Sequence, residues 1–352
     1  MELRNLLRTD LEELEEYVPV KPLDVLALEI GVPVERLVKL DANENLYGPH
    51  PEVLKAIAAA PHHIYPDPGQ ARLRTAIANW LAVEPEQVVA GTGADDLIDV
   101  LIRLVMPPAV AVPTPTFGMY RFLAKISRAK VVEVPRRPNF DLDVVALRHA
   151  VHEGAGIVFL TSPNNPTGNP INRAELDALC GLEALIVVDE AYAEFGGQTV
   201  VPLIEQHPNL VVLRTFSKWA GLAGLRVGFA VSHPELAGHI MAIKQPYNVN
   251  VAAEAGAIAA IEHFAEVRET IASIVAERDR MAGLCAELGW LKPVPSQANF
   301  VLMAVKAGAR GKSPPAFARR GSWSVTTTGR TSRTTSASVL AARRTRIVCS
   351  RR

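Results

Sequence analysis

Short apolar runs alternate with amphipathic stretches through the middle of the chain. Each run is shorter than a typical helix and ends in polar or glycine-rich residues, a pattern typical of strands buried on both faces. Amphipathic helices are expected between these runs, at Pro51–Ala60, Arg72–Leu81 and Asp95–Val105. Strands that alternate with helices predict an α/β fold with a mostly parallel sheet covered by helices. The expected strands are Val88–Ala90, Ala109–Val112, Lys130–Val134, Gly156–Leu160, Leu185–Asp189 and Leu210–Leu213.

A second domain is expected beyond Val231, where the composition shifts. The stretch Val251–Leu288 is rich in alanine, glutamate and arginine and has helical apolar spacing, which predicts one long helix. Ser296–Met303 then has the pattern of a strand of the same domain.

The first strand runs into a glycine-rich turn, Gly91-Thr-Gly-Ala-Asp95, that opens a helix. Backbone N–H groups at such a helix start bind anions, and the helix dipole strengthens the interaction. The third glycine of a dinucleotide fingerprint is missing, so a single phosphate fits this turn better than a dinucleotide. The alternative is a strand–turn–helix connection without a ligand.

Aromatic and amide side chains follow two other strands. Phe117 lies just past Ala109–Val112, where open α/β sheets place their ligands; its ring can stack on a flat cofactor or join the core. The segment Thr161-Ser-Pro-Asn-Asn-Pro-Thr-Gly168 fixes two asparagines between prolines at a strand end. That rigidity suits an amide that must hold one hydrogen bond to a ligand.

An aspartate ends the strand Leu185–Asp189, three residues before Tyr192. A carboxylate buried at that place needs a partner. A pyridinium N–H is suitable, because the carboxylate keeps the ring nitrogen protonated and makes the ring an electron sink. The alternative is an aspartate that caps the next helix.

Lys218 lies in Arg214-Thr-Phe-Ser-Lys-Trp-Ala-Gly-Leu-Ala-Gly-Leu-Arg-Val-Gly-Phe229, after the last strand of the series. Its neighbours are small and apolar, and lost hydration favours the neutral, nucleophilic amine. Such lysines form Schiff bases with carbonyl compounds, of which pyridoxal phosphate is the commonest partner. For a lysine taken alone, an ordinary surface-loop position is the alternative.

Composition narrows the class of protein. At 352 residues the chain is long enough for two domains that share an interface, and 49% hydrophobic with 21% charged residues indicates a globular protein. No run approaches the roughly 18 apolar residues of a membrane span, and the acidic N-terminus does not resemble a secretory signal. Cys180, Cys285 and Cys349 are too widely separated for a metal motif or a disulfide framework. A cytoplasmic, metal-free protein is expected.

The neutral net charge hides two different segments. Residues 306–352 hold 12 lysines and arginines and no acid, so the preceding 305 residues carry 25 basic against 37 acidic residues, a net charge of −12. Residues 306–352 have many serines, threonines and arginines and no apolar periodicity, which predicts an aberrant, basic, disordered tail. One interpretation is a nucleic-acid-binding tail. The interpretation that we prefer is a disrupted reading frame.

Taken together, the motifs resemble those of the fold-type I pyridoxal-phosphate-dependent aminotransferases, and most closely the histidinol-phosphate aminotransferase family. LDANENLYGP, YPDPG, GTGADD, PTPTFGMYR, SPNNPTG, VVDEAY, RTFSKWAGLAGLRVGF and QANFVLM occur in that family's order and spacing across about residues 15–305. The resemblance implies a large cofactor-binding domain (51–245) with a mostly parallel seven-stranded sheet, a smaller α/β domain (246–305), and an N-terminal arm that includes part of the small domain (1–50).

The resemblance also implies a role for each candidate residue. Lys218 would bind the aldehyde of pyridoxal 5'-phosphate, Asp189 would pair with its ring nitrogen, and Phe117 would stack on the ring. Asn165 and Tyr192 would hydrogen-bond the ring oxygen. The remaining residues would contact the cofactor phosphate or the substrate: Ala94, Asp95, Ser217 and Arg226 at the phosphate, Tyr65 at the phosphate in the neighbouring subunit of a homodimer, and Asn43 and Tyr17 at the substrate.

The implied reaction transfers an amino group from glutamate to imidazole-acetol phosphate and gives histidinol phosphate and 2-oxoglutarate, a step of histidine biosynthesis. Lys218 would move a proton between the substrate Cα and the cofactor C4′. The family's carboxylate-binding arginine, in an LR-x-S/T-x-G context, has no counterpart after Met303. Two alternatives therefore stay open: a pyridoxal-phosphate-dependent decarboxylase of an amino-acid phosphate, and a cofactor-binding remnant impaired by its altered C-terminus.

Overall fold

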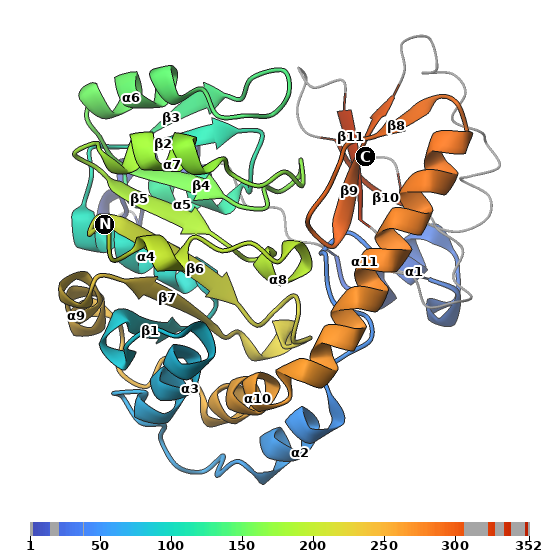
Figure 1. Cartoon of the computed structure of the whole chain (residues 1–352), viewed down its shortest axis with the longest axis horizontal. Helices are drawn as coiled ribbons and strands as arrows, with labels where there is room; N and C mark the ends of the chain where they lie inside the picture. The colour runs from blue at the N-terminus through green and yellow to red at the C-terminus, as the bar shows by residue number, and fades with distance from the viewer. Residues whose placement is uncertain are drawn as a thin grey trace.

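The computed structural model describes residues 3–14, 21–37 and 39–305, together with three short strands at 323–327, 334–338 and 349–350. Figure 1 shows two lobes, a larger one built on a seven-stranded sheet and a smaller one that contains a five-stranded sheet. The helix α11 (Phe264–Glu287) runs from the base of the larger lobe along the smaller one.

The larger sheet has the strand order β1-β7-β6-β5-β4-β2-β3. Neighbouring strands run parallel, except that β7 is antiparallel to both β1 and β6. This confirms the mostly parallel, seven-stranded sheet. The strands are β1 (Val88–Gly91), β2 (Ala109–Thr114), β3 (Lys130–Pro135), β4 (Ala155–Thr161), β5 (Leu185–Asp189), β6 (Leu210–Thr215) and β7 (Gly228–Ser232).

Helices cover both faces of this sheet, as the pattern of short buried strands predicts. Residues alternate along β5, where Ile186 and Val188 join the core under one face and Val187 joins the core under the other. Helices α3 (Ala71–Leu81), α6 (Val144–His152) and α7 (Arg173–Cys180) pack on the first face. The second face is covered by α4 (Ala94–Val105), α5 (Met119–Ile126) and α9 (Pro234–Ile243).

The single long helix expected at Val251–Leu288 is wrong. The structure has two helices, α10 (Val251–Glu262) and α11, with the chain turning at His263. The His263 ring stacks on His50 at a centroid distance of 4.9 Å. Helix α10 packs against α2 (Pro51–Ala59) and α3, whereas α11 leads to the smaller lobe (Figure 1), and one straight helix cannot do both.

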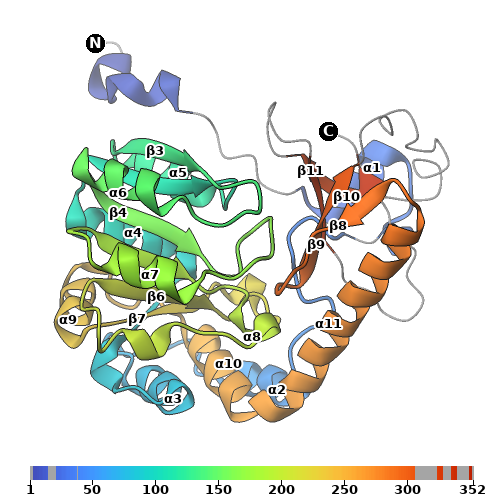
Figure 2. The ribbon, with the colours of Figure 1, turned by 45° about the horizontal axis from the view of Figure 1, so that its top comes forward.

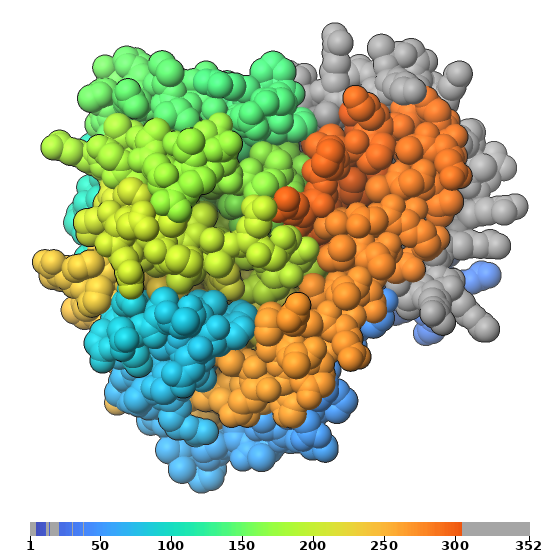
Figure 3. All heavy atoms as spheres, viewed as in Figure 1, coloured from blue at the N-terminus to red at the C-terminus, as the bar shows by residue number. Residues whose placement is uncertain are grey.

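The smaller lobe contains α1 (Leu23–Ile30) and a sheet of order β12-β10-β11-β9-β8. Strands β8 (Leu291–Pro293) and β9 (Phe300–Val305) follow α11. The strand expected at Ser296–Met303 overlaps β9, which begins and ends further along the chain. In Figure 3 the orange atoms of α11 lie directly against the yellow-green atoms of the larger lobe, where α11 contacts α8 (Ala193–Gly196). The domain bounds at residues 50, 245 and 305 stay a prediction.

Three strands of the C-terminal segment complete the smaller sheet. β11 (Thr334–Ser338) pairs antiparallel with β9, and β10 (Trp323–Thr327) lies between β11 and β12 (Cys349–Ser350). The backbone groups along the edge of β9 are available to pair with an extended segment, and β11 uses them. The expected disorder of residues 306–352 stays a prediction. The rest of 306–352 lies outside the described residues.

The described N-terminal residues form two short 3-10 helices, η1 (Leu3–Leu6) and η2 (Thr9–Glu13). Figure 2 shows them beside β3 and α5 of the larger lobe, and the Arg8 guanidinium donates to the Ile126 carbonyl. Among the described helices, none is long and apolar enough to span a membrane.

Gly228 tests how tightly the start of α4 is packed against the sheet. A Cβ at this position would lie 2.7 Å from the Arg214 carbonyl oxygen and 2.8 Å from the Ala94 nitrogen. Gly228→Ala should therefore lower the free energy of unfolding by about 1–3 kcal/mol, measured by urea denaturation. Gly224→Ala is the control, because a Cβ there meets no atom within 4 Å. Equal stabilities of the two variants would contradict this packing.

Candidate active site

The polar residues expected at strand ends meet at one edge of the larger sheet. Asp189 ends β5, Thr161 ends β4 and Thr215 ends β6, and these three strands are parallel, so their carboxyl ends face the same side. Open α/β sheets bind ligands at this edge. The loop that carries Lys218 leaves β6 there and returns to the sheet as β7.

The amine of Lys218 lies inside this site. Its Nζ donates to the Ala42 carbonyl oxygen at 2.8 Å and lies 5.8 Å from the centre of the Tyr192 ring. Burial lowers the pKa of the Lys218 amine to about 8, although the charges of Glu44 and Asp95 oppose this shift. The neutral, nucleophilic form of this amine is therefore far more populated near neutral pH than it is for an ordinary lysine.

Asp189 is buried, with 4% of its surface exposed. Its Oδ2 accepts from the Tyr120 hydroxyl at 2.7 Å and its Oδ1 accepts from the Ala191 N–H at 3.0 Å. Burial raises the pKa of the Asp189 carboxyl to about 6, while these two hydrogen bonds and the charge of Lys218 act in the opposite direction. A cationic partner would stabilise the ionised form of this carboxylate.

A hydrogen-bonded group of side chains surrounds the Tyr192 hydroxyl. The Asn43 amide donates to it at 3.1 Å, and Asn165 donates to the same oxygen. The Asn43 carbonyl oxygen in turn accepts from the Asn299 amide at 3.0 Å, and the Tyr192 ring meets Phe300 edge-on at 5.1 Å. Both lobes therefore contribute to this part of the site.

The residues expected at a phosphate also converge. Ala94 and Asp95 begin α4, and Gly93 before them has φ +84°, which favours glycine. An Arg226 Nη2 lies 3.1 Å from Asp95 Oδ2, and Arg226 Nη1 lies 3.5 Å from the Ser217 hydroxyl oxygen. A helix start with an arginine and a hydroxyl beside it is suited to hold a phosphate.

The remaining candidates have different positions. Phe117 meets Tyr120 edge-on, with ring centroids 5.6 Å apart, so it lies near the Asp189 side of the site. Tyr65 is 81% exposed and contacts the Tyr247 ring at 5.1 Å, without a described contact to the other candidates. Tyr17 lies outside the described residues.

Sequence reasoning missed Tyr120, which reaches Asp189 from α5. Tyr120 lies in the first turn of α5 (Met119–Ile126), and its spacing from Phe117 is equally typical of a core aromatic, so the sequence carried no specific signal for it. Sequence reasoning also missed a buried ion-pair group behind the site, in which Arg214 contacts Glu190 at 2.9 Å and Glu194 at 3.2 Å. Its signal was an arginine at the end of an apolar strand, which requires buried acids as partners.

Two carboxylates share one guanidinium in this ion-pair group. Glu190 accepts from Arg214, from the Val200 N–H and from the Thr199 hydroxyl, whereas Glu194 Oε2 has no hydrogen-bond partner among the described residues. Burial outweighs the charge of Arg214 and raises the pKa of the Glu194 carboxyl to about 7. Glu194 therefore titrates near neutral pH.

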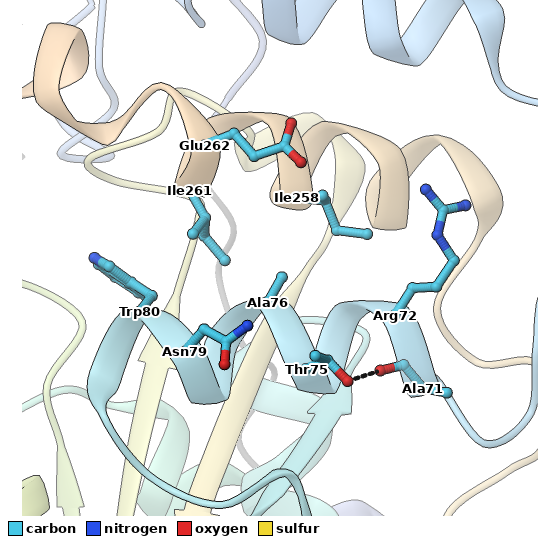
Figure 4. Close-up of a pocket in the computed structure, with 9 residues that line it drawn as sticks. All are labelled: Ala71, Arg72, Thr75, Ala76, Asn79, Trp80, Ile258, Ile261 and Glu262. Carbon is cyan, nitrogen blue, oxygen red and sulfur yellow. Dashed lines mark hydrogen bonds between the residues drawn. The ribbon is translucent and has the colours of Figure 1, made fainter.

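An open groove with a volume of about 730 Å³ lies elsewhere, between α3 and α10 (Figure 4). The groove is lined by none of the candidate residues. Its polar groups do not converge: Thr75 already donates to the Ala71 carbonyl oxygen, and Arg72 and Glu262 stand apart. The described candidate residues therefore lie at the edge of the sheet and not in this groove.

Glu194→Gln tests the buried ion-pair group. A raised folded-state pKa means that the folded protein binds the Glu194 proton more tightly than the unfolded chain does, so stability contributed by this residue falls as pH rises from about 4.5 to about 7. The glutamine variant should lack this pH-dependent contribution to stability. In urea denaturation, the free energy of unfolding of the variant minus that of the unaltered chain should therefore increase by on the order of 2 kcal/mol over that pH range. A difference that does not depend on pH would contradict the assignment.

Comparisons with known proteins agree with this geometry. The family model described as "Aminotransferase class I and II" matches residues 35–347. The histidinol-phosphate aminotransferase of Roseiflexus castenholzii is 48% identical over 321 residues, which cover 88% of this chain and 86% of that protein. The chloroplastic histidinol-phosphate aminotransferase of Nicotiana plumbaginifolia is 44% identical over 311 residues, which cover 87% of this chain and 75% of that protein.

Solved structures have the same fold. The crystal structure of histidinol-phosphate aminotransferase from Sinorhizobium meliloti in complex with pyridoxal-5'-phosphate has a TM-score of 0.80 and 27% identity, and the match covers 91% of this chain and 90% of that one. The L-threonine-O-3-phosphate decarboxylase of Porphyromonas gingivalis has a TM-score of 0.73 at 20% identity, covers 87% of this chain and 95% of that one, and shares the fold. The expected fold class, a fold-type I transferase, is confirmed. From the family match and these relatives, the chain belongs to the class I and II aminotransferase family.

Proposed function

We propose that this protein is a histidinol-phosphate aminotransferase, which uses pyridoxal 5'-phosphate to transfer an amino group between glutamate and imidazole-acetol phosphate in histidine biosynthesis. The observation that carries the proposal is the convergence of Lys218, Asp189 and the start of α4 at one sheet edge. The names of relatives that are 42–48% identical support the substrate.

The residues present fit pyridoxal phosphate group by group. When bound, this cofactor supplies an aldehyde that condenses with amines and a protonated ring that accepts the electrons of a Cα–H bond. Lys218 provides the amine with a lowered pKa, and Asp189 provides a buried acceptor for a ring N–H. The N–H groups of Ala94 and Asp95, with Arg226, provide donors for the phosphate.

Each side chain then has a task in the reaction. Lys218 would hold the cofactor through its neutral amine and, once the substrate amine takes its place, would carry a proton to and from the substrate Cα as general acid and base. Asp189 would accept a hydrogen bond from the ring nitrogen and keep that nitrogen protonated. Tyr192 and Asn165 would hold the ring oxygen, and Phe117 would stack on the ring face. Asn43, tied to the Asn299 amide, faces the substrate.

The C-terminal segment decides whether substrate binding is complete, because the carboxylate-binding arginine implied by the family resemblance is missing there. We propose that residues 322–346 come from a reading frame shifted by one nucleotide. Reading these codons one nucleotide earlier turns the three threonine codons at 326–328, ACN, into NAC codons, which encode Tyr, His, Asn or Asp. In the same reading, the last nucleotide of the Ser322 codon and the first two of the Trp323 codon form NTG, which encodes Leu, Met or Val.

One shifted reading that the genetic code permits for residues 322–346 is VLVRYYDRPDLQDYIRISVGRPEDE. It contains acids, which the tail lacks, and an arginine in an IR-x-S-x-G context close to the missing motif. The nucleotide sequence tests this proposal, since it either contains this second open frame or ends it with stop codons. A basic tail that binds nucleic acid is the alternative.

A homodimer and a cytoplasmic location complete the proposal. Ile64, Tyr65 and Tyr247 are 57%, 81% and 47% exposed, and such apolar surface favours burial against a second copy. Tyr65 would then reach the partner's cofactor phosphate. Sedimentation velocity measures this state, and a monomer at micromolar concentration would contradict it. Cys180 and Cys285 are free, buried thiols, as expected in a reducing compartment.

Product analysis tests the function. The chain with pyridoxal phosphate, glutamate and imidazole-acetol phosphate should form histidinol phosphate and 2-oxoglutarate, and Lys218→Ala should lower the rate by at least about 10³-fold, because it removes both nucleophile and proton carrier. A version with the shifted C-terminal frame should be faster. Carbon dioxide released from an amino-acid phosphate would instead establish the decarboxylase, and a cofactor that binds but reacts with no amino donor would establish the remnant.

A further inference from the structure

Tyr120 is a fully buried tyrosine whose hydroxyl lies against the Asp189 carboxylate. Its exposed fraction is 0%, and its ring is stacked on Phe159 with centroids 5.0 Å apart and an interplanar angle of 4°. The hydroxyl is 2.7 Å from Asp189 Oδ2 and 2.9 Å from Thr161 Oγ1. Full burial and these two hydrogen bonds together hold the hydroxyl in one position relative to the carboxylate.

The hydrogen-bond donors of this group can be assigned by counting protons. An ionised carboxylate only accepts, so the single Tyr120 proton goes to Asp189. The Tyr120 oxygen then accepts from Thr161, whose own proton is used in that bond. The Thr116 hydroxyl lies 3.1 Å from Thr161 Oγ1 but donates its one proton to Asn164 Oδ1 at 2.9 Å, because an amide oxygen only accepts. The protons of Thr161 and Tyr120 therefore point toward Asp189, whereas that of Thr116 points toward Asn164.

This group of hydroxyls lies between two parts of the proposed cofactor site. Thr116 neighbours Phe117, which is expected on the ring face, and Asn164 neighbours Asn165, which donates to Tyr192. The Asn164 amide also donates to the Pro115 carbonyl oxygen and to Thr167, so the loop is held at several points. The group of hydroxyls around Tyr120 therefore lies beside the loop that carries Asn165.

We propose that Tyr120 is a positioning residue, which holds the Asp189 carboxylate in the orientation and charge state needed to pair with a cofactor ring nitrogen. The inference rests on the proposed function. Asp189 Oδ1 is held by the Ala191 N–H and Oδ2 by Tyr120, so each oxygen keeps one direction free for a further donor. Without the hydroxyl, only Oδ1 stays fixed and the carboxylate can rotate.

Loss of the hydroxyl also changes the protonation of Asp189. The Tyr120 hydrogen bond lowers the pKa of the Asp189 carboxyl against the larger effect of burial. The other groups that act on this carboxyl are Lys218, which lowers its pKa, and Asp95, which raises it, while Tyr192 stays neutral over the relevant range because burial raises its own pKa. Without Tyr120, Asp189 should therefore take up a proton at a higher pH.

Tyr120→Phe tests the proposal through cofactor binding by the apoprotein, without turnover. The dissociation constant for pyridoxal phosphate, measured from protein fluorescence between pH 5 and 9, should rise about tenfold near neutral pH, as expected for a lost hydrogen bond to a charged group. The pH below which affinity falls should move upward. Thr161→Val, which keeps the Tyr120–Asp189 bond, should show a smaller change in the same direction.

Phe159→Leu is the control for a merely structural role. It removes the ring stacked on Tyr120 and keeps the hydroxyl, so it should lower stability while leaving the pH dependence of binding in place. Equal pH dependence for Tyr120→Phe and the unaltered chain would overturn the inference and leave the proposed function intact. Failure of the unaltered chain to bind pyridoxal phosphate would overturn both.

Discussion

The burial of opposite charges at the carboxyl edge of the larger sheet is the constraint on which this site depends. Asp189 and the amine of Lys218 are both shifted toward their neutral forms by burial, and neither is held in a direct ion pair with the other in the described structure. Such an arrangement costs stability unless a ligand stabilises it. A ring with a protonated nitrogen and an aldehyde satisfies the carboxylate and the amine together, which explains why a folded chain retains both groups there.

The buried ion-pair group behind these residues contains charges that are paired within the protein. Arg214 joins the end of β6 to Glu190, the residue after Asp189, and to Glu194 in α8, which contacts α11 of the smaller lobe. Breaking a buried pair of this kind leaves an uncompensated charge, so the network resists separation of its elements. The ends of two neighbouring strands and the helix that leads to the smaller lobe are thereby kept together beside the site.

Much of the fold could be predicted because buried parallel strands and their covering helices leave strong patterns. Asp189 could be singled out because a carboxylate at the end of an apolar strand needs a partner. Lys218 taken alone could have been a surface-loop residue, and the motifs around it, in their order and spacing, are what identified it. Tyr120 could not be identified, since an aromatic residue three positions after Phe117 has the same pattern whether or not its hydroxyl meets a carboxylate. The break between α10 and α11 at His263 could not be predicted either, because the apolar spacing continues across it. The strands of the C-terminal segment could not be predicted because they depend on pairing with the backbone edge of β9. The role of Tyr65 involves a second subunit and stays a prediction.

The most direct test of the central claim is to locate the cofactor on the chain. The protein is incubated with pyridoxal phosphate, reduced with borohydride, digested with trypsin and measured by mass spectrometry. The account predicts one phosphopyridoxyl group on the peptide that spans residues 215–226, at Lys218, because among the described lysines this one combines a lowered pKa with the acceptor of Asp189 and the phosphate donors of α4. Labelling at Lys244 or Lys39 instead, or no labelling, would contradict it.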